Sequence, residues 1–225
     1  IENFTRIEND KLEFESVCFN VRHLLEDLMD GYADSARRNN LEVATLVAPT
    51  VPEFLIGDPQ RLRQIIQSLL NNAFRHTIEG SVTLRASCPV DNDLHATVEF
   101  EVSDTGAGMP EDRRRDMQAS FDNHRQDFAN RFVGLGIGLA IAKELVDRMD
   151  GRLSVRSTVG VGSSFIATLR LERGERINHE QRLLAGKRVL IVNDVFEDRG
   201  WLTEVCERER MIVDWAGTGE HALRL

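Results

Sequence analysis

Hydrophobic residues recur along this chain with two spacings, which predict both helices and strands. Apolar positions three and four residues apart predict helices that start at residues 20, 59 and 137. Alternating apolar and polar positions predict strands at residues 12–17, 41–47, 81–88, 94–104, 152–157 and 164–171. The pattern therefore indicates a chain of mixed α/β structure.

The helix that starts at residue 59 has a clear beginning and two different faces. Asp58 is a preferred capping residue, and Pro59 suits the first helical position. One face is apolar, and the opposite face carries a row of polar residues: Arg61, Gln64, Ser68, Asn72 and Arg75. Such a row either lines a site or is a solvated surface, and the helix alone leaves both interpretations open.

The strand at residues 94–104 ends in a carboxylate on its inner face. Five apolar residues alternate onto that face: Leu94, Ala96, Val98, Phe100 and Val102. The same period of two places Asp104 there. Because a buried carboxylate is costly unless a donor meets it, Asp104 is a candidate ligand contact. The alternative is that Asp104 caps the turn that it forms with Thr105 and Gly106.

Three glycines at alternate positions, Gly134, Gly136 and Gly138, lead into the amphipathic helix that starts at residue 137. Glycine lets backbone N–H groups approach an anion, and the start of a helix adds unpaired N–H groups at the same place. The pattern predicts a phosphate site, with close helix–sheet packing as the alternative. We expect Gly151 to end this helix.

The segment at residues 111–131 is long, polar and poorly periodic. It contains three consecutive arginines, Arg113, Arg114 and Arg115. A connection of this length inside a compact domain is usually a lid or a binding loop.

Composition and charge narrow the classes of function. The chain has 225 residues, a formal net charge of −9 and an isoelectric point near 5.2, which argue against a general nucleic-acid surface. No apolar stretch is long enough to span a bilayer, and the first residues of this sequence do not show the basic-then-apolar pattern of a signal peptide. The three cysteines lie far apart in the sequence, which favours reduced thiols and a cytoplasmic setting.

The two ends of the chain look different from its middle. The first residue lies within a charged, helix-like run, so we expect the chain to be a fragment of a longer protein. Residues 173–186 are polar and aperiodic, as in a linker. A buried strand at KRVLIVND, a helix at residues 197–209 and a strand at residues 211–215 then predict one βαβ unit.

Four motifs in order give the chain a family resemblance. GDPQRLRQIIQSLLNNAFRHT, DTGAGMP, GLGIGLAIAKELVDRMDGRLSV and GVGSSF resemble the ATP-binding catalytic domain of sensor histidine kinases, in the nucleotide-binding superfamily of gyrase and the heat-shock ATPases. The resemblance implies a two-layer α/β sandwich, a mixed sheet with helices on one face, over residues 15–172. Residues 1–14 resemble the tail of the dimerising hairpin domain, and residues 187–225 the start of a receiver domain.

The resemblance also implies roles for single residues. Asn72 matches the asparagine that coordinates Mg²⁺, and Asp104 the aspartate that accepts a hydrogen bond from the adenine amino group. The other positions implied to contact ATP are Arg75, Gly106, Gly108, Arg131, Gly134, Gly136, Gly138 and Ser164. Phe121 matches the aromatic residue of the lid.

Some positions depart from the family pattern. Ser68 stands where the hydrolysing relatives carry a glutamate that activates water, which disfavours a hydrolase. The lid sequence before Gly136 is unusual, and Asn193 replaces a usual acidic residue of the receiver. The alternative function is therefore a degenerate, pseudokinase-like domain that regulates another signalling kinase by contact.

The expected partners follow from the same resemblance. None of the six histidines has the flanking pattern of a phosphate acceptor, so that acceptor is expected on the hairpin domain of the same or a partner subunit. A receiver domain is expected as a partner, as is a homodimer of the full-length protein. Attachment of the parent protein to the inner membrane is left open.

Overall fold

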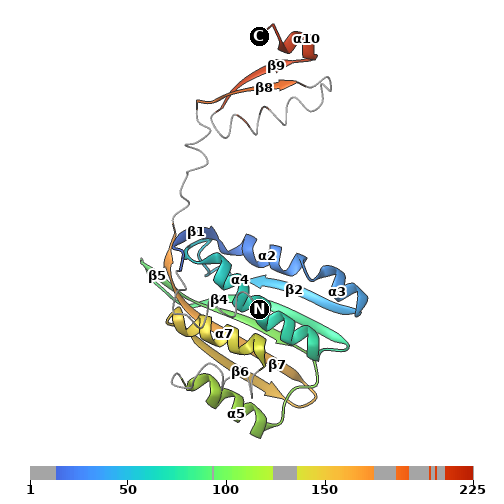
Figure 1. Cartoon of the computed structure of the whole chain (residues 1–225), viewed down its shortest axis with the longest axis vertical. Helices are drawn as coiled ribbons and strands as arrows, with labels where there is room; N and C mark the ends of the chain where they lie inside the picture. The colour runs from blue at the N-terminus through green and yellow to red at the C-terminus, as the bar shows by residue number, and fades with distance from the viewer. Residues whose placement is uncertain are drawn as a thin grey trace. The chain divides into compact units, whose positions relative to one another are not determined.

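A mixed seven-stranded sheet with helices on one face forms the larger part of this computed structural model (Figure 1). The structure describes residues 14–92, 94–123, 136–174, 186–192, 203, 206 and 211–224. The chain divides into two compact units, Ile1–Glu175 and Arg176–Leu225. The strands of the first unit are β1 (Val17–Asn20), β2 (Leu41–Val47), β3 (Phe54–Gly57), β4 (Gly80–Asp91), β5 (His95–Asp104), β6 (Arg152–Thr158) and β7 (Gly162–Arg173). Its helices are α2 (Val21–Asp30), α3 (Ala33–Arg38), α4 (Pro59–His76), α5 (Glu111–Asp122) and α7 (Ile137–Arg148).

The sheet is organised around β7. One edge of β7 pairs with β5, and its other edge is shared by β6 and the short strand β3. Beyond β5 the order continues with β4 and β2, and β2 runs parallel to β4, whereas the other described pairs of this sheet are antiparallel. In the register of β5 with β7, Asp104 lies opposite Ser163. The carboxylate at the end of β5 is thereby placed beside the first residues of β7.

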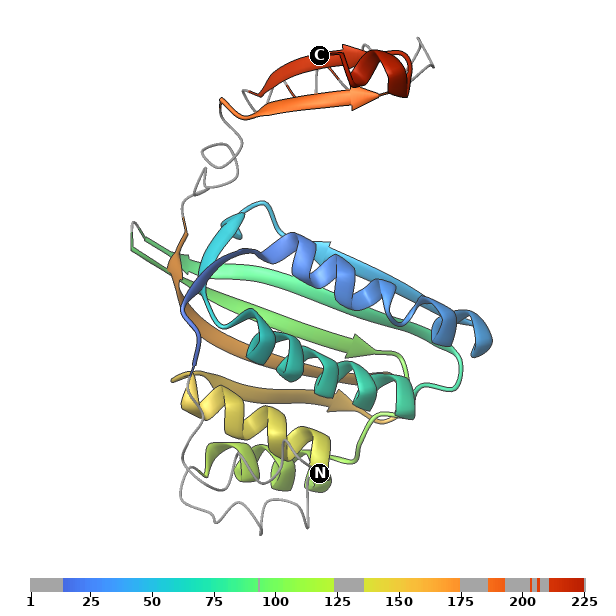
Figure 2. The ribbon, with the colours of Figure 1, turned by 45° about the horizontal axis from the view of Figure 1, so that its top comes forward.

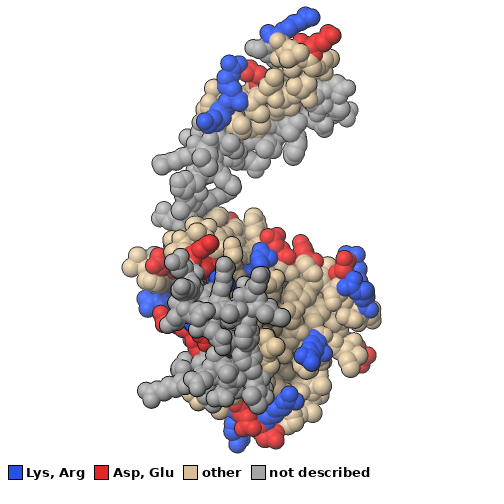
Figure 3. Space-filling view, in the orientation of Figure 1, with Lys and Arg blue, Asp and Glu red and all other residues tan. Residues whose placement is uncertain are grey.

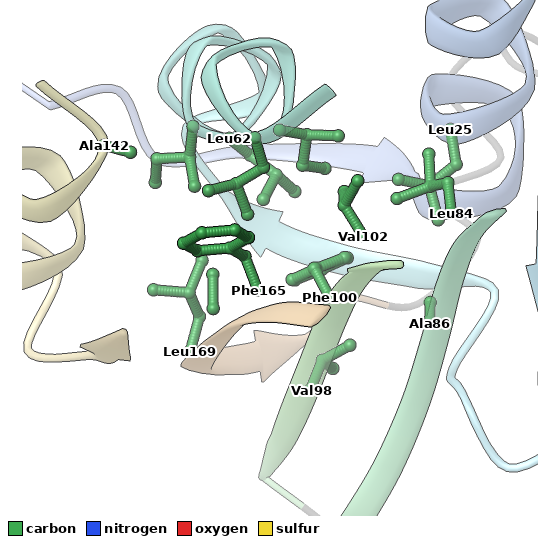
Figure 4. Close-up of a cluster of buried hydrophobic side chains, with 14 of the residues drawn as sticks. Leu25, Leu62, Leu84, Ala86, Val98, Phe100, Val102, Ala142, Phe165 and Leu169 are labelled. Atoms are coloured by element: carbon green, nitrogen blue, oxygen red, sulfur yellow. The ribbon is translucent and has the colours of Figure 1, made fainter. Parts of the chain in front are cut away.

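The hydrophobic core lies between the sheet and the helices α2, α4 and α7, which cross one face of the sheet side by side (Figure 2). In Figure 4, Leu62 of α4 lies above Phe165 of β7, and Phe100 and Val102 of β5 complete the same layer. Ala96, Val98, Phe100 and Val102 are fully buried, as their alternation predicts. Leu94 was expected on the same face, but it precedes β5 and is 72% exposed.

The long helix expected from residue 20 is two helices. Asn20 caps α2 through a hydrogen bond from the backbone N–H of His23, but α2 ends at Asp30, with Gly31 as its C-cap, and α3 begins after Tyr32. Glycine is a poor helix former, and Tyr32 has a partner outside the helix. Its ring stacks on Phe74 with centroids 4.9 Å apart, and its hydroxyl donates to Oδ1 of Asn71 at 2.8 Å. These contacts tie the α2–α3 junction to the end of α4.

The expected strand at residues 12–17 is also shifted. β1 starts only at Val17, and residues 1–13 lie outside the described part of the chain.

The segment predicted as a lid or binding loop begins with a regular helix. α5 covers residues 111–122 and packs on β6, and residues 124–135 lie outside the description. Phe121 is buried against Phe165 in an edge-to-face contact, so it belongs to the core. The side chain of Gln118 accepts a hydrogen bond from the N–H of Val155 at 3.0 Å. α5 is thus held against the outer edge of β6.

α7 ends at Arg148, and Gly151, which was expected to end it, has a different role. The left-handed residue after the helix is Asp150, with φ of 52°. A Cβ on Gly151 would lie 2.5 Å from Cδ2 of Leu169 and 2.6 Å from the carbonyl oxygen of Thr168. Gly151 is therefore required by its close approach to β7, whereas Asp150 supplies the turn.

The N-terminus of α4 allows a first test of the fold. Oδ1 of Asp58 accepts hydrogen bonds from the N–H groups of Gln60 and Arg61 at 3.0 and 2.9 Å, and Oδ2 accepts one from the N–H of Glu15. We expect Asp58→Ala to lower the free energy of unfolding by about 1–2 kcal/mol in urea titrations. Asp58→Asn keeps an acceptor and should cost clearly less. Equal losses in both variants would contradict the capping role.

The second unit contains the parallel strands β8 (Arg188–Val192) and β9 (Ile212–Ala216) and the short helix α10 (Gly219–Ala222). Arg188 of β8 forms an ion pair with Asp214 of β9. The helix expected at residues 197–209 falls largely outside the described residues. Among the helices that the structure describes, none has the length and apolar character needed to cross a membrane.

Candidate functional site

A cleft opens between α4, the start of α5, α7 and the ends of β5 and β7 where Asp104 and Ser163 meet. Its volume is about 120 Å³. Its polar lining residues are Asn72, His76, Asp104, Arg113 and Ser163, and its larger apolar ones are Met109, Met117, Leu139 and Phe165. A lining that combines apolar side chains with a few polar groups is typical of a small-molecule site.

Asp104 is buried at the base of this cleft, with one oxygen bonded and the other available. Oδ1 accepts hydrogen bonds from the N–H of Gly106 at 2.9 Å and of Ser163 at 3.3 Å. Among the described residues, none donates a hydrogen bond to Oδ2. The two interpretations of Asp104 are therefore compatible, because one oxygen caps the turn and the other remains available as an acceptor.

The pKa of Asp104 is raised above its ordinary value, chiefly by burial. The hydrogen bonds from Gly106 and Ser163, and the charge of His76, act in the opposite direction. Keeping this carboxylate ionised in the folded state therefore costs free energy. A residue that served packing alone would not need a buried ionisable group.

Three glycines near the cleft allow close contacts between backbone segments. A Cβ on Gly106 would lie 2.3 Å from the carbonyl oxygen of His76. Gly108 has φ of +65°, and a Cβ there would lie 2.0 Å from the carbonyl oxygen of Thr158. Gly162 has φ of +130°, and a Cβ there would lie 1.9 Å from the carbonyl oxygen of Asp104 itself. The shape of the cleft therefore depends on residues that have no side chain.

The residues of the polar row on α4 do not all line the cleft. Asn72 lines the cleft, whereas the neighbouring Asn71 accepts the Tyr32 hydroxyl bond on another side of the helix. Ser68 donates to the carbonyl oxygen of Gln64 at 3.0 Å, within its own helix. Arg75 is exposed and is not part of the cleft lining. Of the row, only Asn72 is brought to Asp104 in the described cleft.

The glycine-rich segment is described only in part. Gly136, with φ of +77°, precedes α7, and an added Cβ would find no atom within 4 Å. A Cβ on Gly138 would lie 4.0 Å from Cβ of Ser68, an ordinary contact with α4. Arg131 and Gly134 lie outside the described residues, so their proposed contacts stay predictions.

Ser164 is not brought to the cleft. Its hydroxyl is hydrogen-bonded to Ser103 at an oxygen–oxygen distance of 2.6 Å and donates to Glu101, both on β5. Ser103 and Glu101 alternate with the buried residues of β5, so this contact lies on the opposite face of the sheet from Asp104. Ser163 lines the cleft instead. The period of two, counted back from buried Phe165, was the signal that identifies Ser163.

Among the other lining residues that were missed as site residues, His76 and Met117 had a helical signal. His76 follows Asn72 by four positions on α4, and Met117 follows Arg113 by four on α5. Residues four apart share a helix face, so each pair lines the cleft together.

The residues described here provide no metal centre of their own. They contain no group of three or more His, Cys, Asp or Glu side chains that could hold a metal ion. On the face seen in Figure 3, basic and acidic side chains are interspersed over the described surface. A cation or anion in the cleft would therefore depend on single side chains such as Asn72 and Arg113.

Comparison with known proteins gives a consistent family. The family described as "Histidine kinase-, DNA gyrase B-, and HSP90-like ATPase" matches residues 57–173. The sensor protein GacS of Pseudomonas syringae pv. syringae is 36% identical over 180 residues, covering 80% of this chain and 20% of that protein. The histidine-protein kinase BarA of Escherichia coli K12 is 33% identical over 196 residues, covering 84% of this chain and 21% of BarA.

Solved structures agree with the sequence relatives. Full-length ShkA in complex with AMPPNP matches 99% of this chain and 45% of its own, with 26% identity and a TM-score of 0.63. The histidine kinase AdeS of Acinetobacter baumannii, at 17% identity and a TM-score of 0.54, shares the fold. The chain spans about a fifth of the length of the curated relatives it matches.

Proposed function

Because the chain belongs to the Histidine kinase-, DNA gyrase B-, and HSP90-like ATPase family, we propose that it is the catalytic domain of a hybrid sensor histidine kinase and that its cleft binds Mg-ATP. The observation that carries this proposal is the carboxylate of Asp104. Its Oδ1 is held by two backbone N–H groups, and its Oδ2, in a residue that lines the cleft, is available as an acceptor. An acceptor with an apolar surround suits the amino group and the flat faces of a purine.

Mg²⁺ fits this cleft if it arrives with the nucleotide. Asn72 offers one side-chain carbonyl at the cleft wall, and Mg²⁺ keeps most of its ligands as water and phosphate oxygens. When bound, the ion would neutralise charge on the phosphates. Arg131, Gly134, Gly136 and Gly138 are proposed to hold the same phosphates.

Transfer of the γ-phosphate to a histidine is the reaction that we propose for the parent protein. The relatives are named sensor histidine kinases, and ShkA was solved with AMPPNP, an ATP analogue. Ser68 supports kinase over hydrolase, because a hydroxyl bonded to its own helix has no basicity with which to activate water. The acceptor histidine is proposed on the hairpin that precedes this domain, and residues 187–225 are proposed to begin a receiver domain.

Nucleotide titrations on the chain, with and without Mg²⁺, test the binding proposal. We expect Asn72→Ala to weaken Mg-ATP binding about tenfold and to remove most of its Mg²⁺ dependence, since an amide ligand of the ion is lost. Asn71→Ala is the matched control, because Asn71 is adjacent in sequence but bonds to Tyr32. Equal losses in both variants would point to a helix defect and contradict the role of Asn72.

A longer chain that includes the hairpin tests the reaction. Incubation with radiolabelled ATP should give acid-labile label on a histidine. ATP binding without transfer, or neither binding nor transfer, would favour the pseudokinase alternative, and absence of binding would refute the Mg-ATP proposal.

A further inference from the structure

The three consecutive arginines at the start of α5 have different surroundings. Glu111 accepts two hydrogen bonds from Arg114, at 2.7 and 2.8 Å, and lies 3.6 Å from Nη2 of Arg115. The bonds from Arg114 are the main cause that lowers the pKa of Glu111 to about 2. Positions 114 and 115 follow Glu111 by three and four residues, which places both on its side of the helix.

Arg113 lies on another side of α5. It lines the cleft together with Met117, one turn further along the same face. Within the described part of the chain, Arg113 forms neither an ion pair nor a side-chain hydrogen bond. It is exposed, and it is the cleft-lining side chain with a fixed positive charge.

The position of this charge is locally unfavourable. Arg113 is the third residue of α5, where the positive end of the helix dipole disfavours a cation. Glu111 cannot offset it, because Arg114 and Arg115 already surround that carboxylate. A cation at an unfavourable helix position inside a ligand cleft is more readily explained by ligand binding than by stability of the fold.

We propose that Arg113 binds a phosphate group of the nucleotide in this cleft. The inference rests on the proposed function. A guanidinium offers several N–H donors in a plane, which match phosphate oxygens. The chain carries a net charge of −9, so attraction of a polyanion requires a cation at the cleft itself.

The donor chemistry of Arg113 favours phosphate over the base. A guanidinium has donors only, and Asp104 is the acceptor proposed for the purine amino group. Arg113 lies on α5 and Asp104 at the end of β5, so they line the cleft from different elements. Arg75, the basic residue expected near the phosphates, is outside the cleft lining, so Arg113 takes that role.

Binding of ATP, ADP and adenosine to the wild type, Arg113→Gln and Arg115→Gln tests this role. We expect Arg113→Gln to weaken ATP binding about tenfold, to weaken ADP less and to leave adenosine unchanged. Arg115→Gln changes the adjacent charge away from the cleft and should bind all three as the wild type does. The Arg113→Gln variant should unfold at the same or a slightly higher temperature, since an unfavourable helix charge is removed.

The remaining outcomes decide between the proposals. An equal loss for adenosine and ATP would place the guanidinium on the base and overturn the phosphate contact, and an unchanged ATP affinity would overturn it as well. A wild-type chain that binds none of the three ligands would refute the proposed function, and Arg113 with it.

Discussion

Asp104→Asn should weaken ATP binding about 100-fold while leaving the fold at least as stable as that of the wild type. The Asn carbonyl can replace Oδ1 as the acceptor for Gly106 and Ser163. Its NH₂ group then stands in the place of Oδ2, so a donor faces the amino group of the purine. Two donors facing each other in a buried site leave both unsatisfied, at about 1–3 kcal/mol each. Isothermal titration of ATP measures the loss, and unchanged affinity would refute purine recognition by Asp104.

The same variant has a predicted effect on the pH dependence of stability. Burial raises the pKa of Asp104 in the folded state above the ordinary 3.8. The folded state therefore holds this proton more tightly than the unfolded state, and the group favours folding most below pH 3.8. That contribution is lost as the pH rises through the folded-state pKa. Asn cannot ionise, so Asp104→Asn should gain melting temperature relative to the wild type as the pH rises. A loss at neutral pH would show that the turn requires the charge.

Gly162→Ala should be among the most destabilising single substitutions near the cleft. At φ of +130° an alanine is strained, and its Cβ would lie 1.9 Å from the carbonyl oxygen of Asp104, a backbone atom that cannot rotate away. We expect a loss of about 3 kcal/mol in the free energy of unfolding, measured in urea. ATP binding should weaken too, because the end of β5 must move.

Gly136→Ala provides the matched control. Gly136 also has positive φ, +77°, but an added Cβ would meet no atom within 4 Å. Its cost should be limited to backbone strain, about 1–2 kcal/mol. Similar losses for the two variants would show that the contact between Gly162 and β5 can relax.

Much of this fold could be predicted from the periodicity of apolar residues, because that periodicity depends only on residues close together in the sequence. The cap at Asp58 and the inward position of Asp104 both followed from spacing along one element. The break between α2 and α3 could not be predicted in this way, because it is tied to stacking of Tyr32 on Phe74, 42 positions further along the chain.

The candidate site was harder to predict than the fold. Ser164 was chosen where Ser163 lies in the cleft, an error of one residue that reverses the face of the strand. Arg113 was noticed only as one of three arginines. Which of them enters a cleft depends on how α5 packs on β6, and sequence spacing does not contain that packing.

The hydrogen bond from Val155 to Gln118 has a consequence for how copies of this protein meet. β6 is an edge strand of the sheet, where free backbone N–H groups could pair with a strand from another molecule. The side-chain carbonyl of Gln118 accepts a hydrogen bond from one of those N–H groups, and α5 packs against β6 and shields it. This border is therefore protected from the sheet-to-sheet association that leads to aggregation.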